Sequence, residues 1–299
     1  MRPLDRRTFL AGLAASATAL GQDSEPEQRE APADESPNLP GKTPNTRFAV
    51  NIEMWFRRLP VLDRIRASAD LGFDAVEMWG LGGKDLEATA KLCEELGVEV
   101  AQFTAWGFVP GLNDPANHEA FEEAIGRAIE AAAILGARKA TVVGGNDQPG
   151  MTQAEMHENI ITGLKRVAPR VEEANLMLIL EPMNIRVDHA GHCLYGSPEP
   201  VRICRAVDSP MVKINWDLYH MQISEGDLCG RMKDGFDQIG YLQLADHPGR
   251  NEPGTGEIYY PRVLREAKAL GYDDIVGLEC WPRDGEEQAA QRVLQADRW

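Results

Sequence analysis

From residue 47 onward, short apolar runs alternate with longer amphipathic stretches in a regular order. A short apolar run bounded by glycine or polar residues is typical of a strand buried on both faces, and apolar residues at three- and four-residue spacing predict a helix. The predicted strands are residues 48–52, 75–78, 98–103, 140–143, 177–180, 212–216, 241–244 and 275–278. The predicted helices are residues 61–71, 85–96, 117–135, 153–173 and 260–270, with a last helix within 285–299.

The order of these elements predicts the fold class. Glycine follows four of the predicted helices, where a left-handed residue commonly ends a helix; these are Gly72, Gly97, Gly136 and Gly271. Strand and helix alternate throughout, and no GxGxxG motif follows the first strand. This order favours a (β/α)8 barrel over a doubly wound sheet. We therefore predict an α/β protein with a single TIM barrel over residues 47–299.

The chain begins with a segment that has no place in this barrel. Residues 1–22 contain Arg6-Arg7-Thr8-Phe9-Leu10 and then an apolar stretch that ends in small residues. This pattern is typical of a twin-arginine (Tat) signal peptide and is too short for a membrane-spanning helix. It predicts the Tat export machinery as a partner and a periplasmic or other extracytoplasmic location. The alternative is a chance arginine pair in an N-terminal helix of a cytosolic protein.

Residues 23–46 separate the signal peptide from the barrel. They are rich in proline and glutamate and contain almost no large apolar side chain. Such a segment buries too little surface to offset the entropy lost on ordering. We predict a disordered acidic linker that lies outside the fold.

The composition restricts the classes of partner. The 299 residues carry a net charge of −16 at pH 7, which argues against nucleic acid, because that affinity comes from clustered lysine and arginine. A small polar molecule is compatible with this charge. The five cysteines are scattered and form no CxxC pair. They are expected to be mostly buried apolar residues.

Four predicted strands end in a side chain that carries an oxygen ligand: Glu181, Asp217, Gln243 and Glu279. The carboxyl ends of the strands of a (β/α)8 barrel meet at one cavity, so these side chains are expected to converge. Buried carboxylates repel one another unless a cation lies among them, and oxygen ligands suit Mg²⁺ or Mn²⁺. The alternative is that the acids are solvated or pair with arginine. The candidate arginines are Arg186, Arg250 and Arg283.

Histidine and tryptophan residues near the strand ends have open interpretations. His189 and His192 lie in the loop after the fifth predicted strand. Their spacing leaves no third nitrogen ligand nearby, which favours a role in shaping the loop over a second metal site. Four tryptophans at or just past strand ends either form a pocket wall or pack in the rim. They are Trp55, Trp79, Trp106 and Trp281.

Four sequence motifs accompany these strand ends. They read LEPMNIRVDH from residue 180, DLYHMQ from residue 217, LQLADHPGRNEPGTGEI from residue 242 and GLECWPR from residue 277. Over residues 47–283 the chain resembles the hydroxypyruvate isomerase family and its sugar isomerase and epimerase relatives, the xylose isomerase-like barrels. The third motif is the most specific. Many sugar epimerases of this superfamily have histidine where this chain has Gln243, so glutamine favours the hydroxypyruvate isomerase branch.

The resemblance implies a role for each site residue. The implied metal ligands are Glu181, Asp217, Gln243 and Glu279. Glu181 and Glu279 also form the implied catalytic acid/base pair, and the implied substrate-binding residues are His220, Arg250 and Glu257. The resemblance further implies that the chain can assemble as a homo-oligomer.

These roles predict a metal-dependent isomerase that interconverts the aldehyde and ketone forms of a small hydroxy-carbonyl compound through an enediolate. The reaction implied by the family is the conversion of hydroxypyruvate to tartronate semialdehyde. His220 is expected to donate to the developing oxyanion; the alternative is a rim histidine bonded to a backbone carbonyl. Predicted export favours a sugar or keto-sugar outside the cytoplasm as an alternative substrate. A third hypothesis is a non-catalytic sugar-binding barrel. An endonuclease is disfavoured by the six histidines and the acidic charge.

Overall fold

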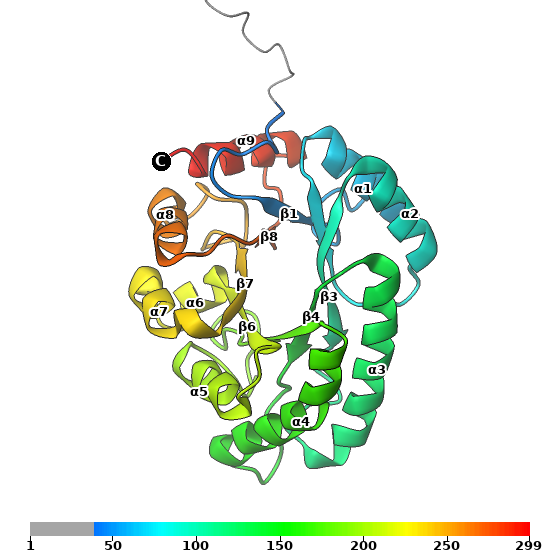
Figure 1. Cartoon of the computed structure of the whole chain (residues 1–299). Coiled ribbons are helices and arrows are strands. Elements are labelled where there is room, and N and C mark those ends of the chain that lie inside the picture. Colours follow the sequence, from blue (N-terminus) through cyan, green and yellow to red (C-terminus); the bar gives the residue numbers. More distant parts are fainter. Residues whose placement is uncertain (1–38) are drawn as a thin grey trace, which may run out of the picture. The chain divides into compact units, whose positions relative to one another are not determined.

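A computed structural model describes residues 39–299, so the predicted signal peptide and most of the predicted linker lie outside the described residues. Eight parallel strands pair in chain order, and β1 pairs with β8 to close a barrel (Figure 1). The predicted (β/α)8 barrel is confirmed. The strands are β1 Phe48–Asn51, β2 Ala75–Met78, β3 Glu99–Trp106, β4 Lys139–Val143, β5 Met177–Glu181, β6 Val212–Asp217, β7 Ile239–Leu244 and β8 Val276–Leu278.

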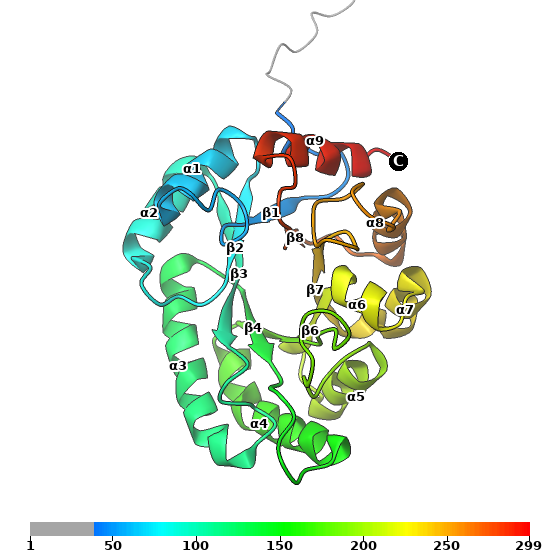
Figure 2. The same ribbon diagram turned by 180° about the vertical axis from the view of Figure 1, so that it is seen from behind.

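Helices surround the strands, as Figure 1 and the view from behind in Figure 2 show. The helices that match a prediction are α1 Val61–Asp70, α2 Leu86–Leu96, α3 His118–Leu135, α4 Gln153–Glu173, α8 Tyr260–Leu270 and α9 Glu286–Ala296. Three further helices have no counterpart among the predictions: α5 Pro198–Val207, α6 Leu218–Ser224 and α7 Leu228–Gly235. Two single turns complete the described elements, η1 Pro115–Asn117 and η2 Phe236–Gln238. Within residues 39–299, no helix is both long and apolar enough to cross a membrane.

The apolar residues of the strands divide into two sets. Side chains that face the helices form the larger core, which includes Phe48, Val76 and Leu180. A separate small cluster fills the interior of the barrel, where small side chains leave room for the few large ones. It consists of Ala49, Ala75, Ala101, Ile179, Tyr241 and Ile275. The interior is therefore packed, and the cavity described below lies beyond this layer towards the carboxyl ends of the strands.

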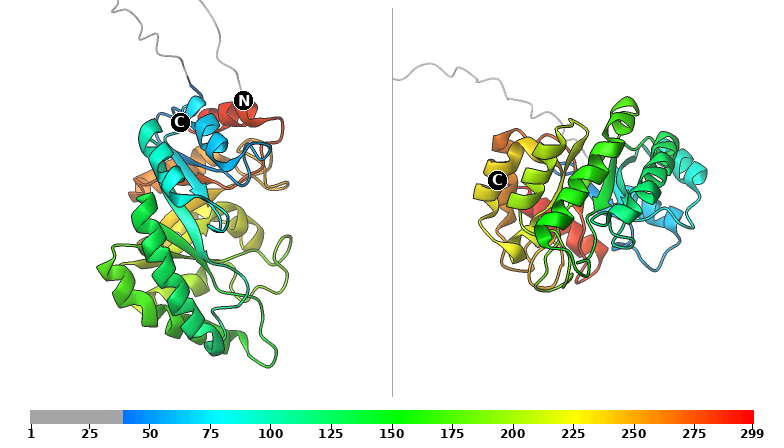
Figure 3. Two further views of the ribbon diagram at one scale, coloured as in Figure 1. Left: turned by 90° about the vertical axis from the view of Figure 1, so that its right-hand side faces the viewer. Right: turned by 90° about the horizontal axis from the view of Figure 1, so that it is seen from below.

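The loops that follow the strands extend from one side of the barrel (Figure 3). Because parallel strands all run in the same direction, the residues at their carboxyl ends share this side. The loop after β7, residues 245–259, and the loop after β5, residues 182–197, both lie here. These loops position the site.

Residues 39–46 pack against the barrel, so the prediction that the linker extends to residue 46 is wrong for this part. The backbone N–H of Gly41 donates to the carbonyl of Leu71 at 2.8 Å. The backbone N–H groups of Asn45 and Thr46 donate to Asp297 Oδ2 at 2.7 and 3.0 Å. Composition missed this contact because the segment is anchored by its backbone donors and not by large apolar side chains.

Candidate functional site

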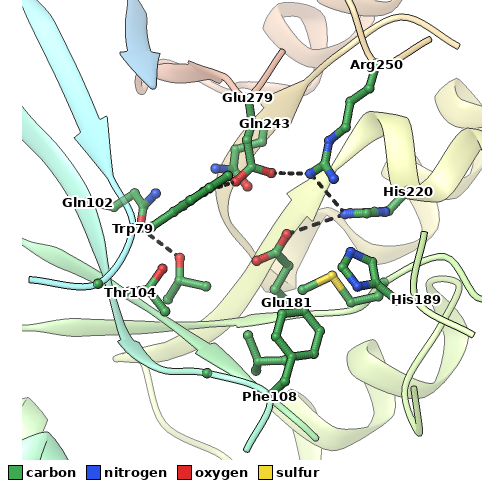
Figure 4. A pocket seen from close by; sticks show the side chains of 15 residues that line it. Trp79, Gln102, Thr104, Phe108, Glu181, His189, His220, Gln243, Arg250 and Glu279 are labelled. Carbon is green, nitrogen blue, oxygen red and sulfur yellow. Dashed lines mark hydrogen bonds and ion pairs between the residues drawn. The ribbon is translucent and has the colours of Figure 1, made fainter. Parts of the chain in front are cut away.

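Three carboxylates meet at the carboxyl end of the barrel. β5 ends at Glu181, β6 ends at Asp217, and Glu279 directly follows β8. Together with His220 they offer ligand atoms that all lie within 4.8 Å of one another. Figure 4 shows Glu181, His220 and Glu279 around one space. The predicted convergence of the strand-end acids is therefore present in the structure.

The acids are buried beside one another, which penalises their ionised forms. Burial and the charges of Glu279 and Asp217 raise the pKa of Glu181 well above its usual value. Burial and the charge of Glu279 raise the pKa of Asp217 to about 7. A cation among the acids would oppose both shifts, because it favours the ionised carboxylates.

Asp217 has two oxygens with different partners. Its Oδ1 accepts the backbone N–H of Tyr219 at 2.8 Å and caps the N-terminus of α6. Its Oδ2 is buried and has no hydrogen-bond partner among the described residues. An unpaired buried carboxylate oxygen is costly, and a metal ion is one of its standard partners. The donor set of the acids therefore fits a hard divalent cation.

Arg250 lies against this cluster. Its guanidinium donates to Glu279 Oε2 at 2.8 Å and lies 3.8 Å from Asp217 Oδ2. It also stacks over the ring of Tyr219, with Cζ 5.1 Å from the ring centroid. The alternative that arginine pairs with the acids is thus realised for Arg250, whereas Arg283 pairs with Asp284.

A layer of hydrogen-bonded polar side chains forms the floor of the site, and sequence analysis missed it. Its centre is Glu77 on β2, which is fully buried. Glu77 accepts hydrogen bonds from Asn51 at 3.1 Å, Gln102 at 3.3 Å and Gln243 at 2.9 Å. Burial and the charge of Glu279 raise the pKa of Glu77 to about 8. The available signal is a glutamate inside the apolar run AVEM.

Gly277 on β8 provides the space that this floor needs. A Cβ at Gly277 would overlap Glu77 Oε2 and would lie 2.9 Å from Gln243 Cγ, closer than real Cβ contacts. The polar floor therefore depends on a residue without a side chain at this position.

Gln243 lines the cavity as predicted, but its amide is already engaged. Its Nε2 donates to Glu77, and its Oε1 accepts from Asn215 Nδ2 at 2.6 Å. A carbonyl oxygen has two lone pairs, so one remains for a metal ion. The contacts with Glu77 and Asn215 fix the orientation of the amide.

A cavity of about 320 Å³ opens above this floor. Phe108 and His189 form one aromatic part of its wall, and Trp79, Thr104 and Gln102 lie on the side away from His189 (Figure 4). Trp79 also donates from Nε1 to Glu279 Oε1 at 2.7 Å. Among the described residues that line the cavity, Arg250 is the one permanent cation.

The other tryptophans lie elsewhere. Trp55 and Trp106 belong to the buried core, and Trp281 stacks beneath Arg57, whose Cζ is 4.7 Å from the ring centroid. Of these four tryptophans, Trp79 is the one that lines the cavity of the site.

The two loop histidines have different environments. His189 stacks on Phe108, with ring centroids 4.9 Å apart, and borders the cavity. His192 is buried, and its Nδ1 contacts the backbone of Leu194. Burial lowers the pKa of His192 to about 4. Neither belongs to the cluster of ligand atoms, in agreement with the interpretation that they shape the loop.

Comparisons with known proteins give a consistent assignment. Residues 65–297 match the family described as xylose isomerase-like TIM barrel. The chain belongs to this family. It is 30% identical to the hydroxypyruvate isomerase of Escherichia coli K12 over 243 residues, which cover 79% of this chain and 94% of that protein. It is 33% identical to the 2-oxo-tetronate isomerase of Cupriavidus necator over 246 residues, covering 80% and 94% respectively.

A solved structure supports the same family. The crystal structure named AP endonuclease, family 2, from Brucella melitensis has a TM-score of 0.76, with 26% identity over 82% of this chain and 96% of that one. Because its curated relatives are named as isomerases, this xylose isomerase-like barrel is an isomerase of that family. The resemblance noted in the sequence is thereby confirmed.

In this xylose isomerase-like barrel, one buried carboxylate organises the loop after β7. Asp246 accepts the backbone N–H groups of His247 and Ile258 at Oδ1, each at 3.0 Å. Its Oδ2 accepts those of Gly254, Thr255 and Gly256 at 2.9, 3.1 and 2.8 Å. The loop motif thus wraps around Asp246, to which sequence analysis assigned no role.

The two predicted loop residues have different locations. Arg250 points into the cavity, as predicted. Glu257 is exposed, accepts a hydrogen bond from Gln222 at 3.1 Å and does not line the cavity. The structure therefore does not bring Glu257 together with the other predicted substrate-binding residues, because its side chain lies on the outer surface of the loop that Asp246 holds.

All five cysteines are unpaired, and four of them are buried, as expected for small apolar residues. Cys280, next to Glu279, is fully buried, and burial raises the pKa of its thiol well above the usual value. A packing role for Cys280 agrees with this environment.

Proposed function

We propose that the protein is a metal-dependent isomerase that interconverts the aldehyde and ketone forms of a small hydroxy-carbonyl compound through an enediolate. The observation that carries this proposal is the buried cluster of Glu181, Asp217 and Glu279, in which Asp217 Oδ2 lacks a hydrogen-bond partner among the described residues. The isomerases among the relatives support the reaction type.

The cofactor in this proposal is Mg²⁺ or Mn²⁺. Glu181, Asp217 and Glu279 would hold it through carboxylate oxygens, and Gln243 would add its amide carbonyl. The bound ion would polarise a carbonyl and the neighbouring hydroxyl of the substrate and so acidify the C–H between them. A zinc site rich in histidine, as an endonuclease of this superfamily would need, is not supported, because His220 is the one histidine in the cluster.

The two catalytic glutamates differ in how firmly they are held. Glu279 accepts hydrogen bonds from Trp79 at 2.7 Å and Arg250 at 2.8 Å. Among the described residues, Glu181 has one polar approach, from His220 Nε2 at 3.9 Å, which is too long for a hydrogen bond. Since no hydrogen bond holds its carboxylate there, we assign to Glu181 the removal of the substrate proton. Either glutamate returns the proton to the adjacent carbon.

Two substrate classes follow from the relatives. Hydroxypyruvate, with tartronate semialdehyde as its product, is the first candidate, because the Escherichia coli relative is a hydroxypyruvate isomerase. A longer sugar, keto-sugar or sugar acid is the second, because the Cupriavidus relative is a 2-oxo-tetronate isomerase. The cavity has a volume of about 320 Å³. Pockets for small molecules typically have volumes of roughly 300–1,000 Å³, so this volume is compatible with both substrate classes.

We also propose that the chain is exported by the Tat machinery to the periplasm or another extracytoplasmic site. The proposal rests on Arg6-Arg7-Thr8-Phe9-Leu10 and the apolar stretch that follows. Fractionation of cells that express the full chain should recover it outside the cytoplasm, and an Arg6→Lys/Arg7→Lys variant should remain inside. An unchanged distribution of the variant would remove this proposal without affecting the isomerase.

Proton exchange in D₂O tests the reaction directly. We expect the Mn²⁺-loaded protein to incorporate deuterium next to the carbonyl of at least one compound in a panel of hydroxypyruvate, 2-oxo-tetronate, ketoses and keto-sugars. Glu181→Gln and Glu279→Gln should slow this exchange by about 10²- to 10⁴-fold, the usual contribution of a general base. NMR spectroscopy or mass spectrometry measures the exchange.

Glu94→Gln is the matched control, since Glu94 is an exposed glutamate on α2 that does not line the cavity. It should exchange at the rate of the parent protein. Circular dichroism should show that each variant is folded. Tight metal binding without exchange of any compound would reject the isomerase and support a non-catalytic sugar-binding barrel.

A further inference from the structure

Asn184, in the loop after β5, has an amide whose orientation is fixed by the backbone. Its Oδ1 accepts the backbone N–H groups of Val187 and Asp188 at 3.0 and 3.1 Å. A backbone N–H can only donate, so the atom that faces these two groups must be the oxygen. The amide nitrogen of Asn184 therefore points in the opposite direction, into the protein.

This amide nitrogen has two N–H bonds and two partners. It lies 2.7 Å from Asp188 Oδ2 and 2.7 Å from His220 Nδ1. The backbone N–H of Asn184 also points at His220 Nδ1, at 3.3 Å. His220 Nδ1 thus faces two donors and no acceptor among these contacts, and it must offer a lone pair.

The other ring nitrogen of His220 faces the cavity. A charged histidine carries a proton on both ring nitrogens, so a ring whose Nδ1 accepts hydrogen bonds is neutral and carries one proton. That proton is on Nε2. The nearest acceptor is Asp217 Oδ2, at 3.5 Å, which has no hydrogen-bond partner among the described residues.

Arg250 is the one neighbour that would favour the opposite tautomer. Its guanidinium nitrogen lies 3.5 Å from His220 Nε2, as Figure 4 shows by a dashed line. That contact is at the limit of a hydrogen bond, whereas the contact of Asn184 with Nδ1 is 2.7 Å. The shorter interaction decides the tautomer.

We propose that Asn184, held by Asp188, is a positioning residue that fixes His220 as the Nε2–H tautomer, so that the ring donates a hydrogen bond into the cavity. In this tautomer Nε2 has no lone pair for a metal ion. His220 is then excluded from the ligand set and is available as a neutral donor to a substrate oxygen that gains negative charge. The catalytic consequence rests on the proposed isomerase function, whereas the tautomer does not.

The tautomer can be measured in the parent protein without substrate. Long-range ¹H–¹⁵N correlation spectra of ¹⁵N-histidine-labelled protein distinguish a protonated from an unprotonated ring nitrogen, and the spectrum of His220→Asn identifies the His220 signals. We expect an unprotonated Nδ1 and a protonated Nε2, both in metal-free and in Mg²⁺-loaded protein. A protonated Nδ1, or exchange between the two tautomers, would overturn the proposal whatever happens to any variant.

An exchange of the two residues tests the cause. The double variant Asn184→Asp/Asp188→Asn has the same total charge. The hydrogen bond between residues 184 and 188 is reversed, because the amide of residue 188 now donates to the carboxylate of residue 184. We expect this carboxylate to draw the proton to Nδ1, to place the Nε2 lone pair in the cavity and to raise affinity for Zn²⁺ relative to Mg²⁺. Isotope exchange should fall by about 10²-fold or more, the usual loss when one oxyanion donor is removed.

Asp188→Asn alone is the matched control. Its amide oxygen can still accept from Asn184, so His220 should keep the Nε2–H tautomer although a negative charge is lost. If the double variant also keeps that tautomer, Asn184 does not set it and the assignment of Asn184 is wrong. If the tautomers behave as expected but the parent protein exchanges no compound in D₂O, the proposed function fails and the tautomer assignment stands.

Discussion

A single side chain, Asp246, holds the loop that carries Arg250. Its two oxygens accept five backbone N–H groups and leave no lone-pair direction for an amide N–H. In Asp246→Asn, the new NH₂ group would face donors, and charge-assisted bonds worth about 1.5–3 kcal/mol each would be lost. The substitution is nearly isosteric, so any effect arises from hydrogen bonding.

We expect Asp246→Asn to leave the barrel folded and to expose the loop. Hydrogen exchange at the amides of residues 254–258 should become faster, while amides of the strands β2 and β5 should remain protected. The isotope-exchange rate should fall by at least about tenfold, since Arg250 loses its fixed position. Glu257→Gln, on the outer surface of the same loop, is the comparison for hydrogen exchange. Unchanged protection at residues 254–258 would mean that the loop does not depend on Asp246.

The roles of these residues differ in how far the sequence could predict them. Glu181, Asp217 and Glu279 end apolar runs, and a parallel barrel brings such ends together whatever their separation in the chain. Glu77 and Asn184 give no such signal. Glu77 lies inside the apolar run of β2. The alternation of side chains along a strand does not by itself show which residues face the interior of the barrel and which face the helices. Asn184 acts through Val187, Asp188 and His220, and that geometry exists only once the loop has folded.

At the scale of elements, long regular patterns were predicted and short ones were not. The longest helices, α3 and α4, end within a residue or two of their predicted limits, because their apolar positions repeat over many turns. α5 begins with Pro198-Glu199-Pro200. Prolines are common at the start of a helix, but here they are followed by too few residues for the helical spacing of apolar residues to be recognised. α6 has seven residues and starts at Leu218, directly after Asp217, so the residue that caps it also ends β6. One aspartate therefore serves the site and the local fold together.

The boundary of the folded part shows the limit of composition. Residues 39–46 have the same proline-rich character as the segment before them, yet Asp297 at the end of α9 accepts the N–H groups of Asn45 and Thr46. A hydrogen bond between residues 252 positions apart in the chain cannot be predicted from the local sequence pattern of either segment. The signal peptide and Tat export remain predictions, because residues 1–38 lie outside the described part of the structure.

At the scale of the whole molecule, the buried acids couple stability to pH. In metal-free protein, Asp217 with a pKa of about 7, Glu77 with a pKa of about 8 and Glu181 with a pKa raised well above 4.5 hold protons that the unfolded chain has already released. The unfolded state then binds fewer protons than the folded state, so the free energy of unfolding falls as pH rises through these folded pKa values. Buried His192 and His220, whose pKa values are lowered, act in the opposite direction, but only below the ordinary value of 6.5.

The window in which the acids act alone is therefore pH 6.5 to about 8. There we expect the metal-free protein to lose up to about 1.4 kcal/mol of unfolding free energy per pH unit for each proton that the folded state still holds and the unfolded state has released. Urea denaturation at several pH values measures this slope. Mg²⁺ or Mn²⁺ should flatten it and should stabilise the protein more at pH 8 than at pH 6.5, because the ion replaces those protons. Asp217→Asn removes one of the acids and should reduce the slope without metal. A metal-free protein whose stability is constant or rises across this window would show that the cluster is not held protonated, and the electrostatic argument for a cation among these carboxylates would fail with it.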